Sequence, residues 1–143
     1  MSETIAIASD HAGVALKATL KESLESQGFQ VLDLGTHGPA SVDYPDFATA
    51  MAAALETGPA ARGILICGTG IGISIAANRH RHVRAALCHD VTTARLCRQH
   101  NDANVLALGA RIVGPEVALD CARAFLATPF EGGRHQGRVA KFS

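Results

Sequence analysis

Cys67 ends a short apolar run and leads directly into the stretch Gly68-Thr69-Gly70-Ile71-Gly72. Alternating glycines let the backbone approach a ligand closely, so their N–H groups could hold a phosphate or stabilise an oxyanion, above all where a helix follows. A cysteine beside a helix N-terminus favours the thiolate and could act as a base or a nucleophile. A tight turn without a ligand and a cysteine that only packs stay open on this spacing alone.

Three further polar clusters have residue types that could do chemistry. Asp10-His11 follows the first apolar run, and His100 stands at the end of a helical pattern. Arg134 and Arg138 are four residues apart, on one face if the tail is helical, and guanidinium groups bind phosphate oxygens well. Taken one at a time, a helix cap, an ordinary helix-end histidine and a solvated basic terminus stay open.

Several familiar sites are not indicated. The glycine loop has neither the GxGxxG spacing of a dinucleotide fold nor the GxxxxGK[ST] pattern of a P-loop. The four cysteines form no CxxC pair, so the sequence signals no zinc site and no disulfide framework, and three of them are expected to be buried free thiols. The run 79–82 (RHRH) is expected to be solvated surface.

The elements that must position these residues alternate along the chain. Apolar runs of strand length are followed by helical patterns, of which the first repeats leucine every four residues, at Leu16, Leu20 and Leu24. Asp90 is expected to cap the fourth helix, and the tail 128–143 has room for one more short helix. The expected strands are 4–9, 29–34, 63–67, 83–88 and 104–108, and the expected helices are 13–27, 45–56, 73–79, 90–100 and 115–127.

This alternation predicts the α/β class. We expect one domain, 1–143, with a doubly wound, Rossmann-like five-stranded parallel sheet and helices on both faces. Ligands of such sheets bind in the crevice outside the carboxyl ends of the strands. Asp10, His11 and Cys67 fall at that edge, whereas His100 follows a helix and is expected at the opposite edge of its own chain.

Composition excludes some classes of protein. Acidic and basic residues balance at 13 each, which disfavours a nucleic-acid binder, and no apolar segment approaches the roughly 20 residues of a membrane span. The N-terminal residues lack the pattern of a secretory signal, and unpaired cysteines suit a reducing compartment. We expect a cytoplasmic protein.

Five stretches together resemble the type B ribose-5-phosphate isomerases, in the family shared with galactose-6-phosphate isomerase subunits. They spread over almost the whole chain, and the third and fourth are long and specific. The stretches are SDHAG (9–13), DYPDFA (43–48), ILICGTGIGISIAAN (64–78), RQHNDANVLALGAR (98–111) and EGGRHQGRV (131–139).

The resemblance implies an aldose–ketose isomerase that interconverts ribose 5-phosphate and ribulose 5-phosphate through a cis-enediolate. It makes Cys67 the base, Thr69 and the loop N–H groups the oxyanion donors, and His100 the group that opens the furanose ring. Some relatives carry a glutamate base at the position of Ile73, which cannot serve here. The implied substrate-binding residues are Asp10, His11, Tyr44, Gly68, Gly70, Gly72, Asn101, Arg111, Arg134 and Arg138, of which His11 and the arginines bind the phosphate.

The resemblance also implies a homodimer whose sites combine residues of two subunits, with His100, Asn101 and Arg111 crossing over; a tetramer stays open. It implies no metal and no cofactor. An isomerase of a six-carbon sugar phosphate, such as allose 6-phosphate or galactose 6-phosphate, is the nearest alternative. A non-catalytic sugar-phosphate or nucleotide sensor on the same fold is a second one, since fold does not fix function.

Overall fold

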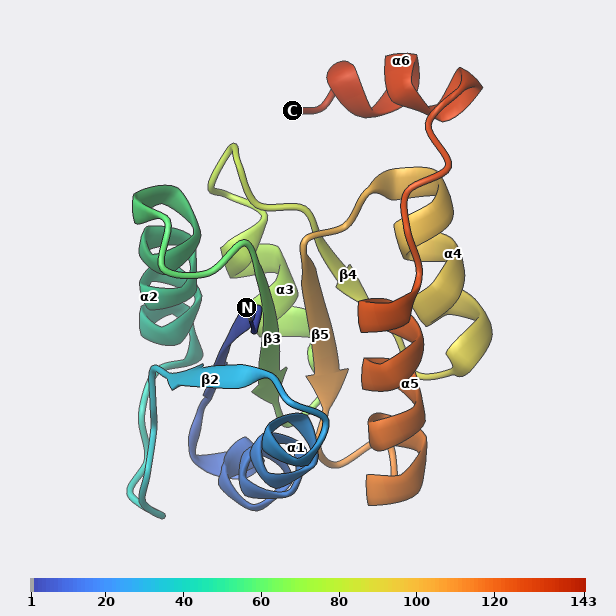
Figure 1. Ribbon diagram of the computed structural model, residues 1–143. Helices are drawn as coiled ribbons and strands as arrows, with labels where there is room; N and C mark the ends of the chain where they lie inside the picture. The colour runs from blue at the N-terminus through green and yellow to red at the C-terminus, as the bar shows by residue number, and fades with distance from the viewer. Residues whose placement is uncertain (1) are drawn as a thin grey trace.

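The computed structural model describes residues 2–143 and contains one five-stranded parallel sheet in the order β2-β1-β3-β5-β4 (Figure 1). The predicted doubly wound, Rossmann-like α/β fold is confirmed. The strands are β1 (Thr4–Ser9), β2 (Gln30–Asp33), β3 (Arg62–Cys67), β4 (Ala85–Leu87) and β5 (Val105–Gly109). The helices are a 3₁₀ turn (His11–Gly13), α1 (Val14–Ser26), α2 (Tyr44–Thr57), α3 (Ile71–Ala77), α4 (Val91–Asn101), α5 (Pro115–Ala127) and α6 (Arg134–Ala140).

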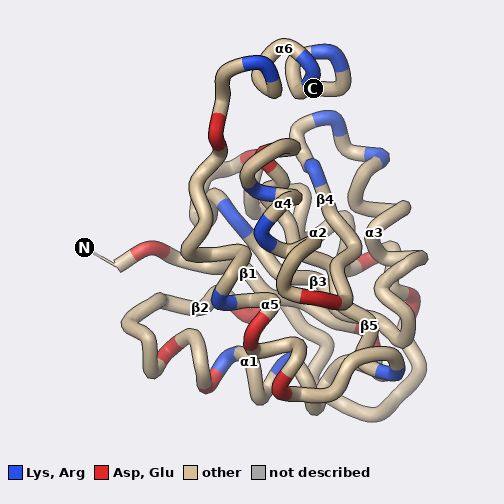
Figure 2. The backbone as a smooth tube through the Cα atoms, turned by 90° about the vertical axis from the view of Figure 1, so that its right-hand side faces the viewer, with Lys and Arg blue, Asp and Glu red and all other residues tan. Residues whose placement is uncertain are grey.

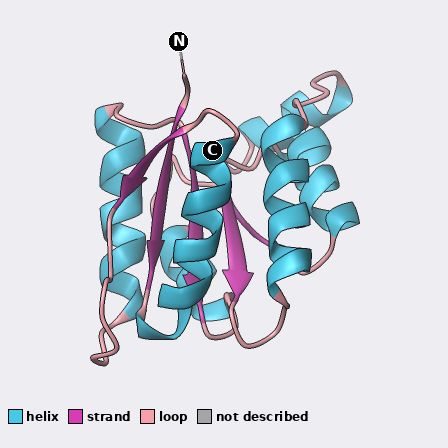
Figure 3. Ribbon diagram, turned by 60° about the horizontal axis from the view of Figure 1, so that its bottom comes forward, coloured by secondary structure: helices cyan, strands magenta, loops and turns pink. Residues whose placement is uncertain are grey.

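Helices cover both faces of the sheet, as the side-on view in Figure 3 shows. On one face, α1, α4 and α5 bury a core that includes Leu20, Leu106 and Phe125. On the other face, α2 and α3 pack over a second core around Met51 and Leu65. Because both faces are covered, the central strands are apolar on both sides and read as continuous hydrophobic runs.

The helix boundaries follow from local chemistry. Leu16, Leu20 and Leu24 are all buried along α1, and Gly28, at φ 96°, turns the chain out of that helix. Asp90 caps α4 as expected, because its carboxylate accepts the N–H of Thr93 at 2.7 Å. These ends determine which residues stand at each edge of the sheet.

Most elements lie within one residue of the predicted bounds, but two begin two residues away from them. Helix α3 begins two residues earlier, because Gly70 (φ 78°) completes the turn and the helix starts at once. Strand β4 is shorter than the predicted 83–88, because asparagine side chains take the place of strand-to-strand hydrogen bonds at its beginning. The Asn104 side chain accepts the N–H of Arg84 at 2.7 Å, and Asn78 bonds both backbone groups of Ala85.

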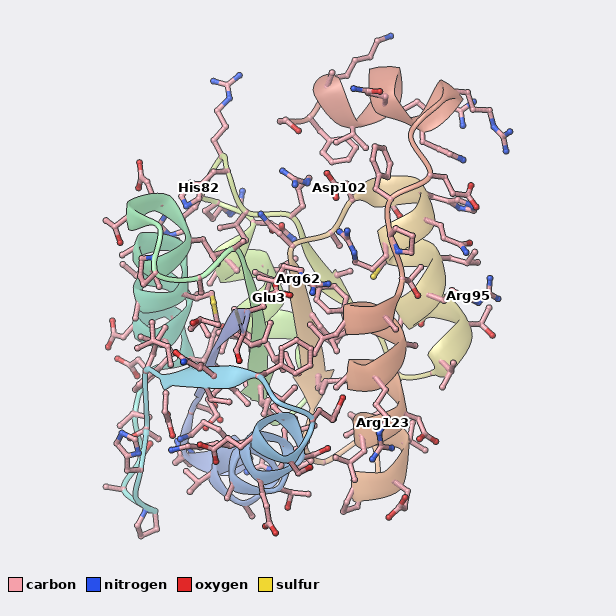
Figure 4. All side chains as sticks on the ribbon, in the orientation of Figure 1. Glu3, Arg62, His82, Arg95, Asp102 and Arg123 are labelled. Atoms are coloured by element: carbon pink, nitrogen blue, oxygen red, sulfur yellow. The ribbon has the colours of Figure 1, made fainter. Side chains whose placement is uncertain are left out.

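The run 79–82 is only partly the solvated surface we expected. Arg79 and Arg81 are exposed. The His82 ring (labelled in Figure 4) instead lies half-buried against α2, with Nε2 2.7 Å from the carbonyl oxygen of Ala52. His82 therefore connects the link before β4 to helix α2 through a hydrogen bond and is not solvated surface.

Two edges of the sheet matter below. The carboxyl edge is where the strands end, at Ser9, Asp33, Cys67, Leu87 and Gly109. The amino edge is where they begin, and there Glu3 and Arg62 point toward one another and form an ion pair with Nε–Oε2 at 2.8 Å (Figure 4). The hydrogen bonds from Arg62 outweigh partial burial and hold the pKa of Glu3 below its usual value.

Candidate active site

The turn after β1 lies against the end of β3. The N–H of Asp10 donates to the carbonyl of Ile66 at 3.1 Å, and a Cβ on Gly13 would come within 2.7 Å of the Ile66 side chain. Only glycine fits that contact, so the turn can press onto β3. Asp10 is 6% exposed, and its carboxylate accepts the N–H of Ala12 at 3.0 Å. This packing brings Asp10 and His11 to the carboxyl edge beside the strand that ends in Cys67.

Cys67 lies at the base of the glycine loop and is 4% exposed. The N–H of Gly70 donates to its Sγ at 3.1 Å. A Cβ on Gly70 would collide with the Leu108 backbone at 2.8 Å, so glycine is required there both by this contact and by the positive φ. The loop thus folds over the sulfur, and Thr69, at its exposed tip, accepts the N–H of Ile71 through Oγ1 at 3.2 Å.

Tyr44 and His11 border the same loop from the side. The Tyr44 ring lies over Gly72, where a Cβ would be 2.5 Å from its Cζ. The N–H of Val42 donates to Nδ1 of His11 at 3.2 Å. Because Nδ1 accepts, a neutral His11 carries its proton on Nε2, which leaves that nitrogen as a donor.

Arg111 does not stand where we expected it. It was predicted to cross over with His100 and Asn101, but it lies against the glycine loop of its own chain. Its N–H donates to the carbonyl of Gly68 at 2.9 Å, and its Nη1 would be 3.2 Å from a Cβ on Gly68. The reason is topological: Arg111 follows β5 directly, and β5 ends at the same edge as β3.

The other three cysteines, Cys88, Cys97 and Cys121, are free thiols buried in the core, as predicted for three of the four. They lie on the face of the sheet that α4 and α5 cover. Burial raises the pKa of Cys121 to about 11, so it stays an unreactive thiol at neutral pH. Among the four, Cys67 alone combines the end of a strand with a glycine loop.

The remaining predicted site residues lie at the amino edge. His100 and Asn101 end α4 immediately before the turn into β5, and Arg134 and Arg138 are exposed on α6. Figure 1 shows α6 beside that end of α4, opposite the arrowheads of β3 and β5. The expected position of His100, far from its own Cys67, is confirmed. Figure 2 shows Lys and Arg gathered at this end of the molecule.

Two anchors hold the tail to the end of α4. The N–H of Glu131 donates to the carbonyl of Gln99 at 3.1 Å. Arg98, 9% exposed, donates to the carbonyls of Thr128 and Ala103 and forms an ion pair with Asp102 at 2.9 Å. Arg98 therefore ties together the end of α4, the start of β5 and the start of the tail.

His135 was not singled out from the sequence, yet its ring stacks on His100, with the centroids 4.4 Å apart. Burial, with the nearby charges of His100 and Arg134, lowers the pKa of His135, so it is neutral at neutral pH. Glu131 also reaches this pair and was likewise missed. No spacing rule links residue 100 to residues 131 and 135, and only the docking of the tail brings them together.

The candidate site therefore consists of two parts that one chain keeps apart. We call them the carboxyl-edge half (Asp10, His11, Tyr44, Cys67, Gly68, Thr69, Gly70, Gly72 and Arg111) and the amino-edge half (His100, Asn101, Arg134 and Arg138). A hollow of about 690 Å³ adjoins the second half and is lined in part by Asn101, Arg81 and Phe142.

A parallel α/β sheet with a cysteine and a glycine loop at its carboxyl edge places the chain in the class of α/β proteins that bind ligands at the strand ends. Within that class, the profile of the family described as Ribose/Galactose Isomerase matches residues 5–142. The chain belongs to this family, and it is an isomerase.

Individual relatives are similar over almost their whole length. Ribose-5-phosphate isomerase B of Escherichia coli is 48% identical over 94% of this chain and 91% of its own. D-erythrulose-4-phosphate isomerase of Pectobacterium atrosepticum is 44% identical over 96% and 91%. The crystal structure of ribose-5-phosphate isomerase B from Mycoplasma genitalium with bound ribulose-5-phosphate superposes with a TM-score of 0.92, at 46% identity over 99% and 94% of the two chains.

Proposed function

We propose that this protein interconverts ribose 5-phosphate and ribulose 5-phosphate through a cis-enediolate, with Cys67 as the base. The observation that carries the proposal is the environment of Cys67, whose sulfur lies buried under a glycine loop and accepts the N–H of Gly70. The same reaction is named for the relative from E. coli, and the structure from M. genitalium holds the ketose product of that reaction.

In this mechanism the Cys67 thiolate removes the proton on C2 of the open-chain aldose and returns it to C1. The hydroxyl proton passes from O2 to O1, so the reaction needs no net acid or base. Between the two steps, negative charge develops on the enediolate oxygens, and Thr69 with the loop N–H groups would stabilise it; such donors typically contribute about 3–4 kcal/mol. Asp10 and Tyr44 would hold the sugar hydroxyl groups from the side.

The phosphate and the ring oxygen need groups that the carboxyl-edge half supplies only in part. We propose that a second copy of the chain completes the site with its amino-edge half. His100 of that copy would open the furanose ring, Asn101 would orient the sugar, and Arg134 and Arg138 would bind the phosphate together with His11. Arg111, at the carboxyl edge, would assist them from its own chain.

An exposed apolar strip beside the loop supports the homodimer. Ile71 and Ile75 on α3 are 50% and 53% exposed, and Leu87 and Val91 stand nearby on β4 and α4 with more than a third of their surface open. Strand β4 is also an edge of the sheet. Apolar patches of this kind mark interaction surfaces. With a two-fold axis at this surface, each copy would add its amino-edge half to the carboxyl-edge half of the other, which gives two equal sites.

The substrate is tested by incubating the purified protein separately with ribose 5-phosphate, allose 6-phosphate and galactose 6-phosphate and measuring ketose formation. We expect the highest kcat/KM with ribose 5-phosphate. A clear preference for either six-carbon substrate would overturn the pentose assignment. Binding of all three sugars without turnover would favour a non-catalytic sensor.

We further propose that the protein works in the cytoplasm. Four free, buried cysteines suit a reducing compartment. Within residues 2–143, no helix has the length and apolar character needed to cross a bilayer. Fractionation of the source cells, with activity measured in each fraction, tests this directly.

A further inference from the structure

The amino edge carries a cluster of three side chains, of which the proposed isomerisation uses only His100. His100 is in the last turn of α4, Glu131 lies on the segment that leads into α6, and His135 is in the first turn of α6. The backbone bond from Glu131 to Gln99 brings the tail alongside α4 and so gathers the three residues. Glu131 and His135 follow His100 by 31 and 35 residues in the sequence, but the three side chains form one compact group.

The donor atoms of these three side chains are close enough together to be ligands of one metal ion. One ring nitrogen from each histidine and one carboxylate oxygen of Glu131 all lie within 4.8 Å of one another. Nε2 of His135 is 3.6 Å from Oε1 of Glu131, and the two imidazole rings stack with an interplanar angle of 18°. The three donors therefore converge on one small volume.

A second observation points to a missing ligand. Nε2 of His135 is buried and has no hydrogen-bond partner, although the residue is only 6% exposed. The 3.6 Å to Glu131 is too long for a hydrogen bond. Buried polar atoms are nearly always satisfied, and leaving one unpaired has a free-energy cost. An ion between His135 and Glu131 would remove that cost.

We propose that His100, Glu131 and His135 bind a divalent transition-metal ion of the Zn²⁺ type. Two imidazoles and one carboxylate make a ligand set that zinc uses with a fourth, open position. Tetrahedral bonds of about 2.0–2.1 Å require ligand atoms roughly 3.4 Å apart. Nε2 of His135 and Oε1 of Glu131, at 3.6 Å, are nearly that close already, and the most distant pair, within 4.8 Å, must approach by up to about 1.4 Å. Glu131, whose side chain is 51% exposed, has the freedom to swing inward, and the stacked rings, 18° from parallel, must turn out of the stack so that the plane of each ring contains the ion.

In this proposal the bound ion inhibits the enzyme and takes no part in catalysis; this regulatory role rests on the proposed function. If His100 opens the sugar ring, its ring nitrogen must exchange a proton with the ring oxygen. A nitrogen that coordinates a metal ion has no lone pair left for that transfer. A bound ion would also occupy space beside Arg134, where the phosphate is proposed to bind. Zn²⁺ should therefore inhibit the enzyme reversibly.

Equilibrium dialysis against Zn²⁺, with Co²⁺ as an absorbing substitute, measures the site without reference to activity. We expect about one ion per chain and a Co²⁺ spectrum of low coordination number. The conservative variant Glu131→Gln changes a half-exposed side chain and should leave the fold intact. It should weaken binding by at least about 10–100-fold, the loss typical of residues that only support a ligand, and so should His135→Gln. His80→Gln, which alters the other close histidine pair, is the matched control and should bind like the wild type.

Cys67→Ala separates this cluster from metal capture by the proposed catalytic thiolate, and it should retain full Zn²⁺ binding. No stoichiometric uptake, or uptake unchanged in both Glu131→Gln and His135→Gln, would overturn the site.

Inhibition by Zn²⁺ should be present in wild-type enzyme and weakened in Glu131→Gln at equal basal turnover. Zn²⁺ binding at this cluster without inhibition of an active enzyme would overturn the regulatory role. An enzyme inactive on every sugar phosphate that still binds Zn²⁺ would instead refute only the proposed function.

Discussion

The two halves of the candidate site are built in different ways. Most of the carboxyl-edge half consists of residues at or just after the ends of strands, and close backbone contacts hold it in place: the N–H of Asp10 donates to Ile66, and the loop folds over Cys67. The amino-edge half stands on a helix end and on a tail. Its two arginines are exposed, and the tail reaches α4 through a small number of polar anchors, chiefly Arg98.

The difference indicates a division of work. Proton transfer needs atoms held to within a fraction of an ångström, which the ends of buried strands can provide. Phosphate capture tolerates a more mobile element, because long, charged side chains can adapt to the anion. Changes in the first half should therefore lower kcat most, whereas changes in the arginines should act chiefly on substrate capture. The following predictions test this contrast.

The largest effect is expected for Cys67→Ala. Losing a positioned acid–base group should lower kcat by roughly 10²–10⁴-fold, and exchange of the substrate C2 proton with solvent deuterium should fall in step. Cys121→Ala, which alters a buried thiol away from the loop, is the control and should affect stability rather than kcat. Near-normal turnover of Cys67→Ala would exclude cysteine as the base.

Combining a variant that lacks a residue of one half with a variant that lacks a residue of the other half should restore activity. Cys67→Ala and His100→Ala, each nearly inactive, should regain up to roughly a quarter of wild-type activity when refolded together, since random pairing gives half heterodimers with one intact site each. The activity of the mixture, corrected for the separate variants, is the measurement. If mixed dimers form without recovery, both residues act within one chain and the exchange of halves is wrong.

The arginine pair should produce a smaller loss. Arg138→Ala removes one charge-assisted phosphate contact, worth about 1.5–3 kcal/mol, or roughly 10–150-fold in kcat/KM. Inorganic phosphate should compete with substrate in the wild type and much less in this variant. Arg123→Ala, at an exposed arginine on α5 (Figure 4), should change neither. Equal phosphate inhibition of wild type and Arg138→Ala would contradict the clamp.

The smallest effect concerns the stability of the carboxyl edge. Asp33, at the end of β2, accepts Lys17 Nζ at 2.7 Å and the N–H of Gly35 at 2.9 Å. Burial alone would raise the pKa of Asp33, but these hydrogen bonds and the Lys17 charge outweigh it and lower the pKa. A lowered pKa in the folded state means that the stabilisation is present above the unfolded value of about 3.9 and is lost as pH falls through the folded value.

Asp33→Asn should therefore cost about 1–3 kcal/mol of unfolding free energy near pH 7, and the difference from wild type should shrink below about pH 4. Urea unfolding at a series of pH values measures it. Asp120→Asn breaks an exposed ion pair with Arg123 and should cost almost nothing at any pH. A pH-independent difference between Asp33→Asn and wild type would mean that the carboxylate charge is not the cause.

The sequence by itself determined the α/β class and the strand-end residues Asp10, His11 and Cys67 of the carboxyl-edge half. Strand and helix periods alternate strongly, and in a parallel sheet every residue that follows a strand reaches the same edge, so Asp10 and Cys67 could be placed together in advance. The same rule places Arg111, which follows β5, at the carboxyl edge, whereas the family resemblance had grouped it with His100 and Asn101.

Only the tertiary structure decided the amino-edge arrangement. Whether the tail docks, and against which helix, depends on contacts such as Arg98 to Thr128 and Glu131 to Gln99, which link residues some 30 positions apart. No local period encodes such a contact, because its energy comes from satisfying backbone groups left open at the ends of other elements. The stacking of His135 on His100, and with it the proposed metal site, appears only once the chain has folded.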